Sequence, residues 1–192
     1  MVIAACALLG SDDRRLDFTN MWRFGSMRSE DAYGGGGSVA DGGPKNQIET
    51  FSLLTTDIED VNAMWIALYE GVGRANEALR RIDLLTETEY PNKVLREAEC
   101  RFIRAHFYFL LKIMFKYPVW FDESVPKEDL KFLTNKEYTN DQLWDNIAAD
   151  FEFAINNLPV IQSQVGRASK VAVWAYLAKV RLYQAYERSC FI

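Results

Sequence analysis

The residue types that most often carry acid–base or metal chemistry are sparse in this 192-residue chain. Its single histidine, His106, stands among aromatic residues in a helical pattern, which favours a buried structural histidine over a catalytic triad or a multi-histidine metal site. The three cysteines, Cys6, Cys100 and Cys190, are far apart and odd in number. This spacing predicts neither a disulfide framework nor a zinc ligand set, and we interpret Cys100 as a small buried residue.

The acidic residues do not form a pattern that is typical of acid–base catalysis. Glu97 and Glu99 are two apart in a helical stretch, so their carboxylates point to different faces, whereas Glu97 and Arg101 are spaced for an ion pair. The run Gly34–Gly37 lacks the preceding strand and the following Lys-Ser/Thr of a phosphate-binding loop. We therefore expect no enzyme activity: no catalytic residues, no metal and no cofactor.

The composition is that of a globular protein, with 49% hydrophobic and 26% charged residues. The net charge is −5, and 22 Lys+Arg are outnumbered by 27 Asp+Glu, so a nucleic-acid-binding surface is not expected. The sequence has no apolar run of the roughly 18 residues that a membrane-spanning helix needs, so no such helix is predicted.

Apolar residues at steps of three and four predict four helices, and no strand pattern of comparable length occurs. The first begins at about Asp57, the second runs over about 94–117 before Pro118, the third begins at Thr139-Asn140 and ends before Pro159, and the fourth runs over about 169–186. Aromatic residues on these apolar stripes are expected in the core. They are Trp65, Phe102, Trp144, Phe151 and Trp174.

The four helices form two similar pairs. Trp65 begins one pair and Trp144 the other, and Ala98-x3-Phe102 in the second helix is matched by Ala172-x3-Tyr176 in the fourth. An aromatic residue early in one helix and small residues in the next are typical of tetratricopeptide repeats. The Trp-to-Ala spacings of 33 and 28 residues are unequal. The predicted fold is therefore all-α, with irregular tetratricopeptide-like repeats and a long glycine-rich loop near the N-terminus.

We interpret the chain, 1–192, as one partial domain. Residues 1–10 are expected to be the end of a helix; the alternative is a lipoprotein cleavage box at Ile3-Ala4-Ala5-Cys6, although no basic region precedes it. Two glycine clusters make 11–64 a loop-rich segment. The first helix pair is assigned to 65–117 and the second to 140–188.

Five elements of the sequence, in this order, resemble the SusD/RagB family. They are the stripe Trp65–Ile82, the stretch Glu97–Phe109 (EAECRFIRAHFYF), the turn Pro118-Val119, the element Asp150–Pro159 and the element Gly166–Tyr183. The resemblance covers about residues 20–188, and it departs from the family pattern at Lys116-Tyr117, where a Phe-Gly pair is usual. Family members are much longer and carry a lipoprotein signal, so we expect this chain to be incomplete at both ends.

The resemblance implies a non-catalytic role at the outer membrane. Family members face outward, cap a SusC-like TonB-dependent transporter, and capture oligosaccharides, polysaccharides or other nutrients for import. The alternative is a helical-repeat scaffold that binds a protein partner without a small ligand. We also expect the isolated chain to be weakly stable or to self-associate, because the fourth helix has one apolar face without a following repeat.

Sugars bind through aromatic rings that stack on their C–H faces and through charged groups that bond their hydroxyls. Four residues of the early loop offer these groups, and Arg28-Ser29-Glu30-Asp31 resembles a family segment near the ligand face. The alternative is that Arg28 and Asp31 pair with each other or cap a turn, and that Trp22 belongs to the core. The predicted ligand-binding residues are Trp22, Arg28, Asp31 and Tyr33.

Overall fold

The computed structural model describes residues 2–10, 24–35, 37–38, 43–52 and 55–189, and in this part of the chain all regular structure is helical. The α-helices are α1 (Val2–Cys6), α2 (Gly43–Glu49), α3 (Glu59–Asp83), α4 (Lys93–Phe115), α5 (Asn140–Asn157) and α6 (Lys170–Ser189). Two short 3₁₀ helices are η1 (Ala7–Gly10) and η3 (Leu130–Phe132). The predicted all-α, tetratricopeptide-like class is confirmed.

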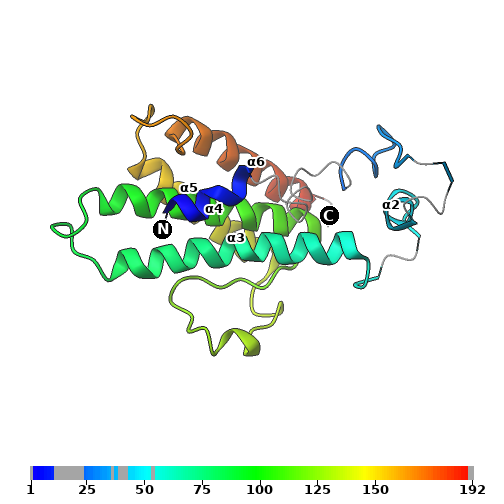
Figure 1. Ribbon diagram of the computed structural model, residues 1–192, viewed down its shortest axis with the longest axis horizontal. Helices are drawn as coiled ribbons and strands as arrows, with labels where there is room; N and C mark the ends of the chain where they lie inside the picture. Colours follow the sequence, from blue (N-terminus) through cyan, green and yellow to red (C-terminus); the bar gives the residue numbers. More distant parts are fainter. Residues whose placement is uncertain (1, 11–23, 36, 39–42, 53–54, 190–192) are drawn as a thin grey trace. The chain divides into compact units, whose positions relative to one another are not determined.

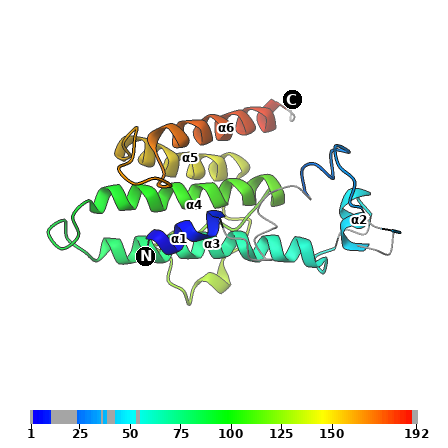
Figure 2. The ribbon, with the colours of Figure 1, turned by 45° about the horizontal axis from the view of Figure 1, so that its top comes forward.

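The chain divides into two compact units. The first, here called the helical unit, comprises residues 1–7 and 71–192, and the second, the loop unit, comprises residues 8–70. Helix α3 passes from the loop unit into the helical unit. Within the helical unit α4 packs against α5 and α5 against α6, while the Gly71–Asp83 part of α3 runs beside α4 (Figure 1, Figure 2).

Large aromatic side chains fill the core of the helical unit. Trp144 and Phe151 are fully buried, and Phe102 is nearly so, as predicted. The ring of Tyr176 on α6 stacks on Phe151 with 5.8 Å between ring centroids, so that α4, α5 and α6 meet in one aromatic cluster. Cys100 is buried in a neighbouring cluster with Val2 of α1, which confirms its interpretation as a core residue.

The core assignment of Trp174 was wrong, because this side chain is 50% exposed. Helix α6 packs on α5 through the opposite side, which carries Val173, Tyr176 and Val180. The periodic pattern identified an apolar stripe correctly but could not show which apolar side of α6 faces α5. In the loop unit Trp65 is half-buried and its ring lies 4.6 Å from that of Tyr69.

The helix ends follow local sequence signals. Thr139 caps α5, since its side chain accepts a hydrogen bond from the backbone N–H of Gln142 while the Gln142 side chain accepts one from the N–H of Thr139. This confirms the predicted start of the third helix. Helix α4 ends at Phe115, three residues before Pro118, with Lys116 at a positive φ of 59°.

The segment predicted to be loop-rich also contains helical structure. Helix α2 begins at Gly43, and α3 begins at Glu59, before the first stripe aromatic. Pro44 stands in the first turn of α2, a position where the missing N–H of proline leaves no helical hydrogen bond unmade. In the sequence this proline looked like a loop marker because it follows two glycines.

Gly71 and Gly73 provide a matched test of how α3 packs on α4. A Cβ added at Gly71 would lie 2.5 Å from Cγ of Phe107, whereas one added at Gly73 would meet nothing within 4 Å. We expect Gly71→Ala to lower the free energy of unfolding by about 1–3 kcal/mol through overpacking. Gly73→Ala should raise it by about 0.5–1 kcal/mol through helix propensity. Urea denaturation measures both, and equal stabilisation by the two changes would contradict the close helix contact.

Candidate functional site

Three of the four predicted ligand-binding residues lie together in the segment 24–35 of the loop unit. Trp22, the fourth, lies outside the described residues. Residues 24–30 form consecutive turns in which the Ser29 N–H donates to the Gly25 carbonyl and the Ala32 N–H to the Ser26 carbonyl, each at 3.0 Å. These turns hold Arg28, Asp31 and Tyr33 within six positions on a backbone that is hydrogen-bonded locally.

Arg28 is held by an aromatic ring and not by a carboxylate. Its guanidinium carbon lies 4.3 Å from the ring centroid of Phe51, and its Nε is buried without a hydrogen-bond partner. Among the described residues it makes no ion pair with Asp31, whose Oδ2 accepts a hydrogen bond of 2.9 Å from the Ser29 hydroxyl. The alternative in which Arg28 and Asp31 pair with each other is therefore wrong.

Tyr33 presents its ring to solvent, with 73% of the residue exposed. A hydrogen bond fixes the backbone of the next residue: the N–H of Gly34 donates to Oε2 of Glu49 on α2 at 3.0 Å. A Cβ at Gly34 would lie only 3.0 Å from that oxygen and from Cε of Met27, so glycine permits this close passage. An exposed ring beside an exposed carboxylate and a guanidinium is an arrangement that can stack on a sugar and bond its hydroxyls.

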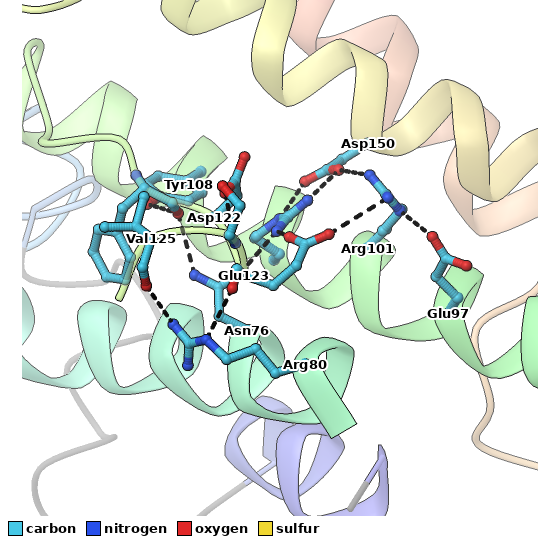
Figure 3. A network of polar contacts seen from close by, with 12 residues as sticks. Asn76, Arg80, Glu97, Arg101, Tyr108, Asp122, Glu123, Val125 and Asp150 are labelled. Carbon is cyan, nitrogen blue, oxygen red and sulfur yellow. Dashed lines mark hydrogen bonds and ion pairs between the residues drawn. The ribbon is translucent and has the colours of Figure 1, made fainter. Parts of the chain in front are cut away.

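A second, larger polar cluster lies in the helical unit, where Figure 3 shows Asn76, Glu123 and Asp150 pointing toward one another. Arg104 bonds all three. Its Nε and Nη2 donate to the two oxygens of Asp150 at 2.6 and 2.7 Å, and its Nη1 donates to Oδ1 of Asn76 at 2.8 Å and to the Glu123 carboxylate. Burial opposes the charge, but the hydrogen bonds and charges of Asp150 and Glu123 outweigh it and raise the pKa of Arg104. We call these residues, together with Arg101, the Arg104 network.

Arg101 extends the network along α4. Its Nε donates to Glu97 at 2.9 Å, which confirms the ion pair predicted from their spacing, and its Nη1 donates to Asp150 at 3.2 Å. Its guanidinium also lies 4.5 Å from the ring centroid of Phe153. Sequence reasoning missed Glu123 and Asp150 as partners, because nothing in a helical pattern shows which acid from another element will meet a buried arginine.

The same region fastens the loop that follows α4 to the helices (Figure 3). The Tyr108 hydroxyl donates to the Phe121 carbonyl at 2.9 Å and accepts from the Phe121 N–H at 2.8 Å. Arg80 donates to the carbonyls of Glu123 and Val125 at 2.9 and 3.1 Å, and Asn76 donates to the Phe121 carbonyl at 3.1 Å. The Arg104 network is therefore structural: it holds three helices (α3, α4 and α5) and a loop in one arrangement.

A cavity of about 510 Å³ opens beside this network. Arg80, Arg101 and Glu123 border it, and all three side chains already have protein partners. Leu79, Ile82 and the exposed Leu84 supply apolar surface. Ser124, which also lines the cavity, donates its hydroxyl to Oδ1 of Asp122 at 2.6 Å. The remaining lining residues are Asp83 and Glu97.

Burial in the packed helices shifts the pKa of two side chains, Cys100 and His106. Burial raises the pKa of the Cys100 thiol to about 12, which disfavours the nucleophilic thiolate. Burial, with a contribution from the charge of Lys179, lowers the pKa of His106 to about 4, and the ring packs edge-on against Tyr176 at 5.1 Å. The buried Nδ1 atom of His106 has no hydrogen-bond partner, and the ring also packs against Phe107.

Within the described ranges no three His, Cys, Asp or Glu side chains come close enough together to hold a metal ion. In the same part of the chain, none of the helices combines the length and the apolar character needed to cross a lipid bilayer.

Comparisons with known proteins give one consistent family. A family model for SusD-like proteins, described as "Starch-binding associating with outer membrane", matches residues 41–182. "SusD-like protein P2" of Formosa agariphila is 29% identical over 147 residues, which are 76% of this chain and 28% of that protein. The chain therefore spans less than a third of that relative's length.

Solved structures of the same kind are similar over nearly the whole chain. A laminarin-binding SusD-like protein has a TM-score of 0.72 at 24% identity, covering 97% of this chain and 40% of that one. Surface glycan-binding protein A from Bacteroides thetaiotaomicron, solved with laminarihexaose, has a TM-score of 0.67 at 25% identity, covering 97% and 38%. Another structure, solved with a xylogluco-oligosaccharide, has a TM-score of 0.64 at 25% identity, covering 93% and 34%.

The Arg104 network can be tested by removing one carboxylate. The side chains of Arg104 and Asp150 are only 3% and 4% exposed, so Asp150→Ala leaves a buried cation short of its main partner. We expect a loss of about 3–5 kcal/mol in the free energy of unfolding. Glu152→Ala, on the same helix, breaks an exposed pair with Arg181 and should cost about 0–1 kcal/mol. Similar urea midpoints for the two variants would show that the network is not needed for stability.

His106 should make stability depend on pH. Its folded pKa of about 4 lies below the ordinary value of 6.5, so the unfolded chain binds the proton first and stability falls as pH falls through this window. Between pH 7 and pH 5 the loss from this residue should be about 2 kcal/mol. Urea titrations of the wild type and His106→Gln isolate it by difference. Equal losses in the two proteins would contradict a buried neutral imidazole.

Proposed function

Because the chain belongs to the SusD-like family of starch-binding proteins that associate with the outer membrane, we propose that it captures a glycan without converting it chemically. The captured glycan is handed to a SusC-like TonB-dependent transporter, on which the protein sits at the outward face of the outer membrane. The family description supports the membrane association and the glycan. The transporter partner follows from the SusD/RagB resemblance.

The observation that carries the proposal is the likeness, over 97% of this chain, to a glycan-binding protein solved with laminarihexaose. Two solved structures with different bound oligosaccharides share this fold at 25% identity, which makes an oligosaccharide or a polysaccharide the expected ligand class. Capture needs shape and hydrogen bonding but no acid, base or metal. This fits a loop segment that offers a ring, a carboxylate and a guanidinium.

We assign ligand contact to Trp22, Arg28, Asp31 and Tyr33. The exposed ring of Tyr33 can stack on the apolar face of a sugar, and the exposed carboxylate of Asp31 can accept from two neighbouring hydroxyls. Arg28 supplies a guanidinium in the same segment, a group that donates to ligand oxygens. Packing of the Arg28 guanidinium on Phe51 limits its motion and reduces the entropy lost on binding.

A second candidate function is a helical-repeat scaffold that binds a protein partner without a small ligand. The observation that favours it is the exposed apolar surface of α6. The two functions differ in one cheap measurement. A saturating glycan raises the melting temperature of a glycan-binding protein by mass action and leaves that of a scaffold unchanged.

Affinity electrophoresis against laminarin, xyloglucan and starch tests the capture function and its site. We expect retardation of the chain by at least one of these glycans. Tyr33→Ala should weaken that retardation by about tenfold in affinity, because the ring supplies the stacking surface. Phe132→Ala is the matched control, since Phe132 is a similarly exposed aromatic residue in the helical unit and should leave binding unchanged.

Two results would count against this assignment. Equal retardation of the wild type and Tyr33→Ala would remove the early loop from the site. A folded chain, verified by its circular dichroism, that no glycan retards or stabilises would favour the scaffold.

A further inference from the structure

Two cysteines that are far apart in the sequence share one apolar cluster of the helical unit. Cys6 ends α1, Cys100 lies on α4, and residues 7–99 separate them in the chain. Cys100 is buried in a cluster with Val2, and Cys6, one helical turn after Val2 on the same side of α1, packs against this cluster. The fold therefore brings together two thiols whose spacing in the sequence predicted no disulfide.

Helix α1 is held in place by contacts with the longer helices. It packs against α3 and α4 (Figure 1, Figure 2). Ala5 is completely buried, and Nη1 of Arg74 on α3 donates to the Ala4 carbonyl at 3.3 Å. A helix of five residues is too short to be stable alone, so these contacts determine its position. They hold the Cys6 side chain at the cluster that contains Cys100.

The acidity of Cys100 also indicates that the two thiols lie close together. Burial is the main reason that the pKa of the Cys100 thiol is raised to about 12. The next cause is a negative charge on Cys6, which comes ahead of the carboxylate of Glu99, the neighbour of Cys100 in the sequence. Because the interaction between charges weakens with distance, this order agrees with the packing of Cys6 against the cluster.

We propose that Cys6 and Cys100 form an intramolecular disulfide that joins α1 to α4. A disulfide requires Cβ atoms about 3.5–4.5 Å apart, a separation within the reach of two side chains packed in one cluster. Disulfides form and persist in the bacterial periplasm and at cell surfaces, and the outward-facing location of the proposed function is of this kind. The bond itself needs only the contacts of the helical unit and no glycan.

The oxidant is a disulfide, either a small molecule or a protein. Cys6 reacts first, because it is half-buried whereas Cys100 is fully buried. The Cys6 thiolate attacks one sulfur of the oxidant, forms a mixed disulfide and expels a thiolate. Cys100 then loses its proton, attacks the Cys6 sulfur and expels the second thiolate. The two cysteines together lose two protons and two electrons, and the oxidant is reduced to two thiols.

The surroundings of the two thiols determine how fast this bond forms. Burial, with a contribution from the charge of Glu99, raises the pKa of Cys6, and burial raises that of Cys100. Only the thiolate attacks a disulfide, so oxidation of the folded chain is slow at neutral pH and accelerates as pH rises. Once formed, the bond is shielded on the Cys100 side, which slows its reduction.

A tryptic map recorded without reductant tests the bond. The three cysteines fall in three different tryptic peptides, which are 1–14, 97–101 and 189–192. After oxidation of the folded 192-residue chain with oxidised glutathione, we expect peptides 1–14 and 97–101 in one linked species that a reductant separates. Oxidation in urea is the control. Without the fold to select a pair, the unfolded chain should give a mixture of the three pairings.

The melting temperature gives an independent readout. Closing a loop of about 100 residues constrains the unfolded chain, so the oxidised wild type should melt about 5–15 °C above the reduced form. Cys190→Ser keeps both cysteines of the pair and should show the same difference, whereas Cys6→Ala should show none.

Two results would overturn the proposal. One is a folded, oxidised chain in which peptides 1–14 and 97–101 stay separate, or in which either is linked to 189–192 instead. The other is an equal change in melting temperature on reduction for the wild type and Cys6→Ala. Glycan binding enters neither measurement, so a failure of the capture function and a failure of this bond are distinguishable.

Discussion

The buried guanidinium of Arg104 is the constraint on which the helical unit depends. A charge with a side chain only 3% exposed is tolerated only when its donors are met, and here the acceptors come from three different elements. Asn76 belongs to α3, Asp150 to α5, and Glu123 to the loop after α4. Each acceptor fixes its own element against α4, so one cation sets the positions of two neighbouring helices and a loop. Misplacing any of them would leave a buried donor without water or partner, which penalises alternative packings more strongly than apolar contacts do.

The aromatic core and the Arg104 network contribute in different ways to the specificity of this fold. Rings such as Phe151 and Tyr176 supply the area that drives the helices together, but apolar surfaces tolerate small shifts in register. The bidentate contact of Arg104 with Asp150 tolerates much less, because two parallel hydrogen bonds require one orientation. Tyr108 orients the loop after α4 in the same way, because its hydroxyl both donates to and accepts from the backbone of Phe121.

The sequence predicted the parts of this structure that depend on local signals. Steps of three and four located α3 to α6 to within a few residues, and Thr139 with Gln142 marked a helix start through a contact three residues long. The partners of Arg104 stand 19, 28 and 46 residues away, and no periodic pattern encodes them. Helix α2 was missed because Gly43-Pro44 is equally compatible with a turn and with a helix start. At the candidate site, Arg28 and Asp31 are close in the sequence, and this suggested a shared site. The ring that contacts the Arg28 guanidinium belongs to Phe51, which follows both glycine clusters in the sequence.

The core assignment of Trp174 was wrong for the same reason: a local pattern does not identify the surface that a side chain contacts. Periodicity reports that a helix side avoids water, but it does not report whether the covering surface lies in the same chain. Helix α6 has apolar residues of both kinds: Tyr176 contacts Phe151 of α5, whereas Trp174 is 50% exposed. The proposed ligand contacts Arg28, Asp31 and Tyr33 belong to the loop unit and Trp174 to the helical unit, so the two regions depend on different contacts. A substitution at Tyr33 is therefore expected to leave the packing of α6 on α5 intact, and one at Tyr176 to leave the turns around Arg28 intact.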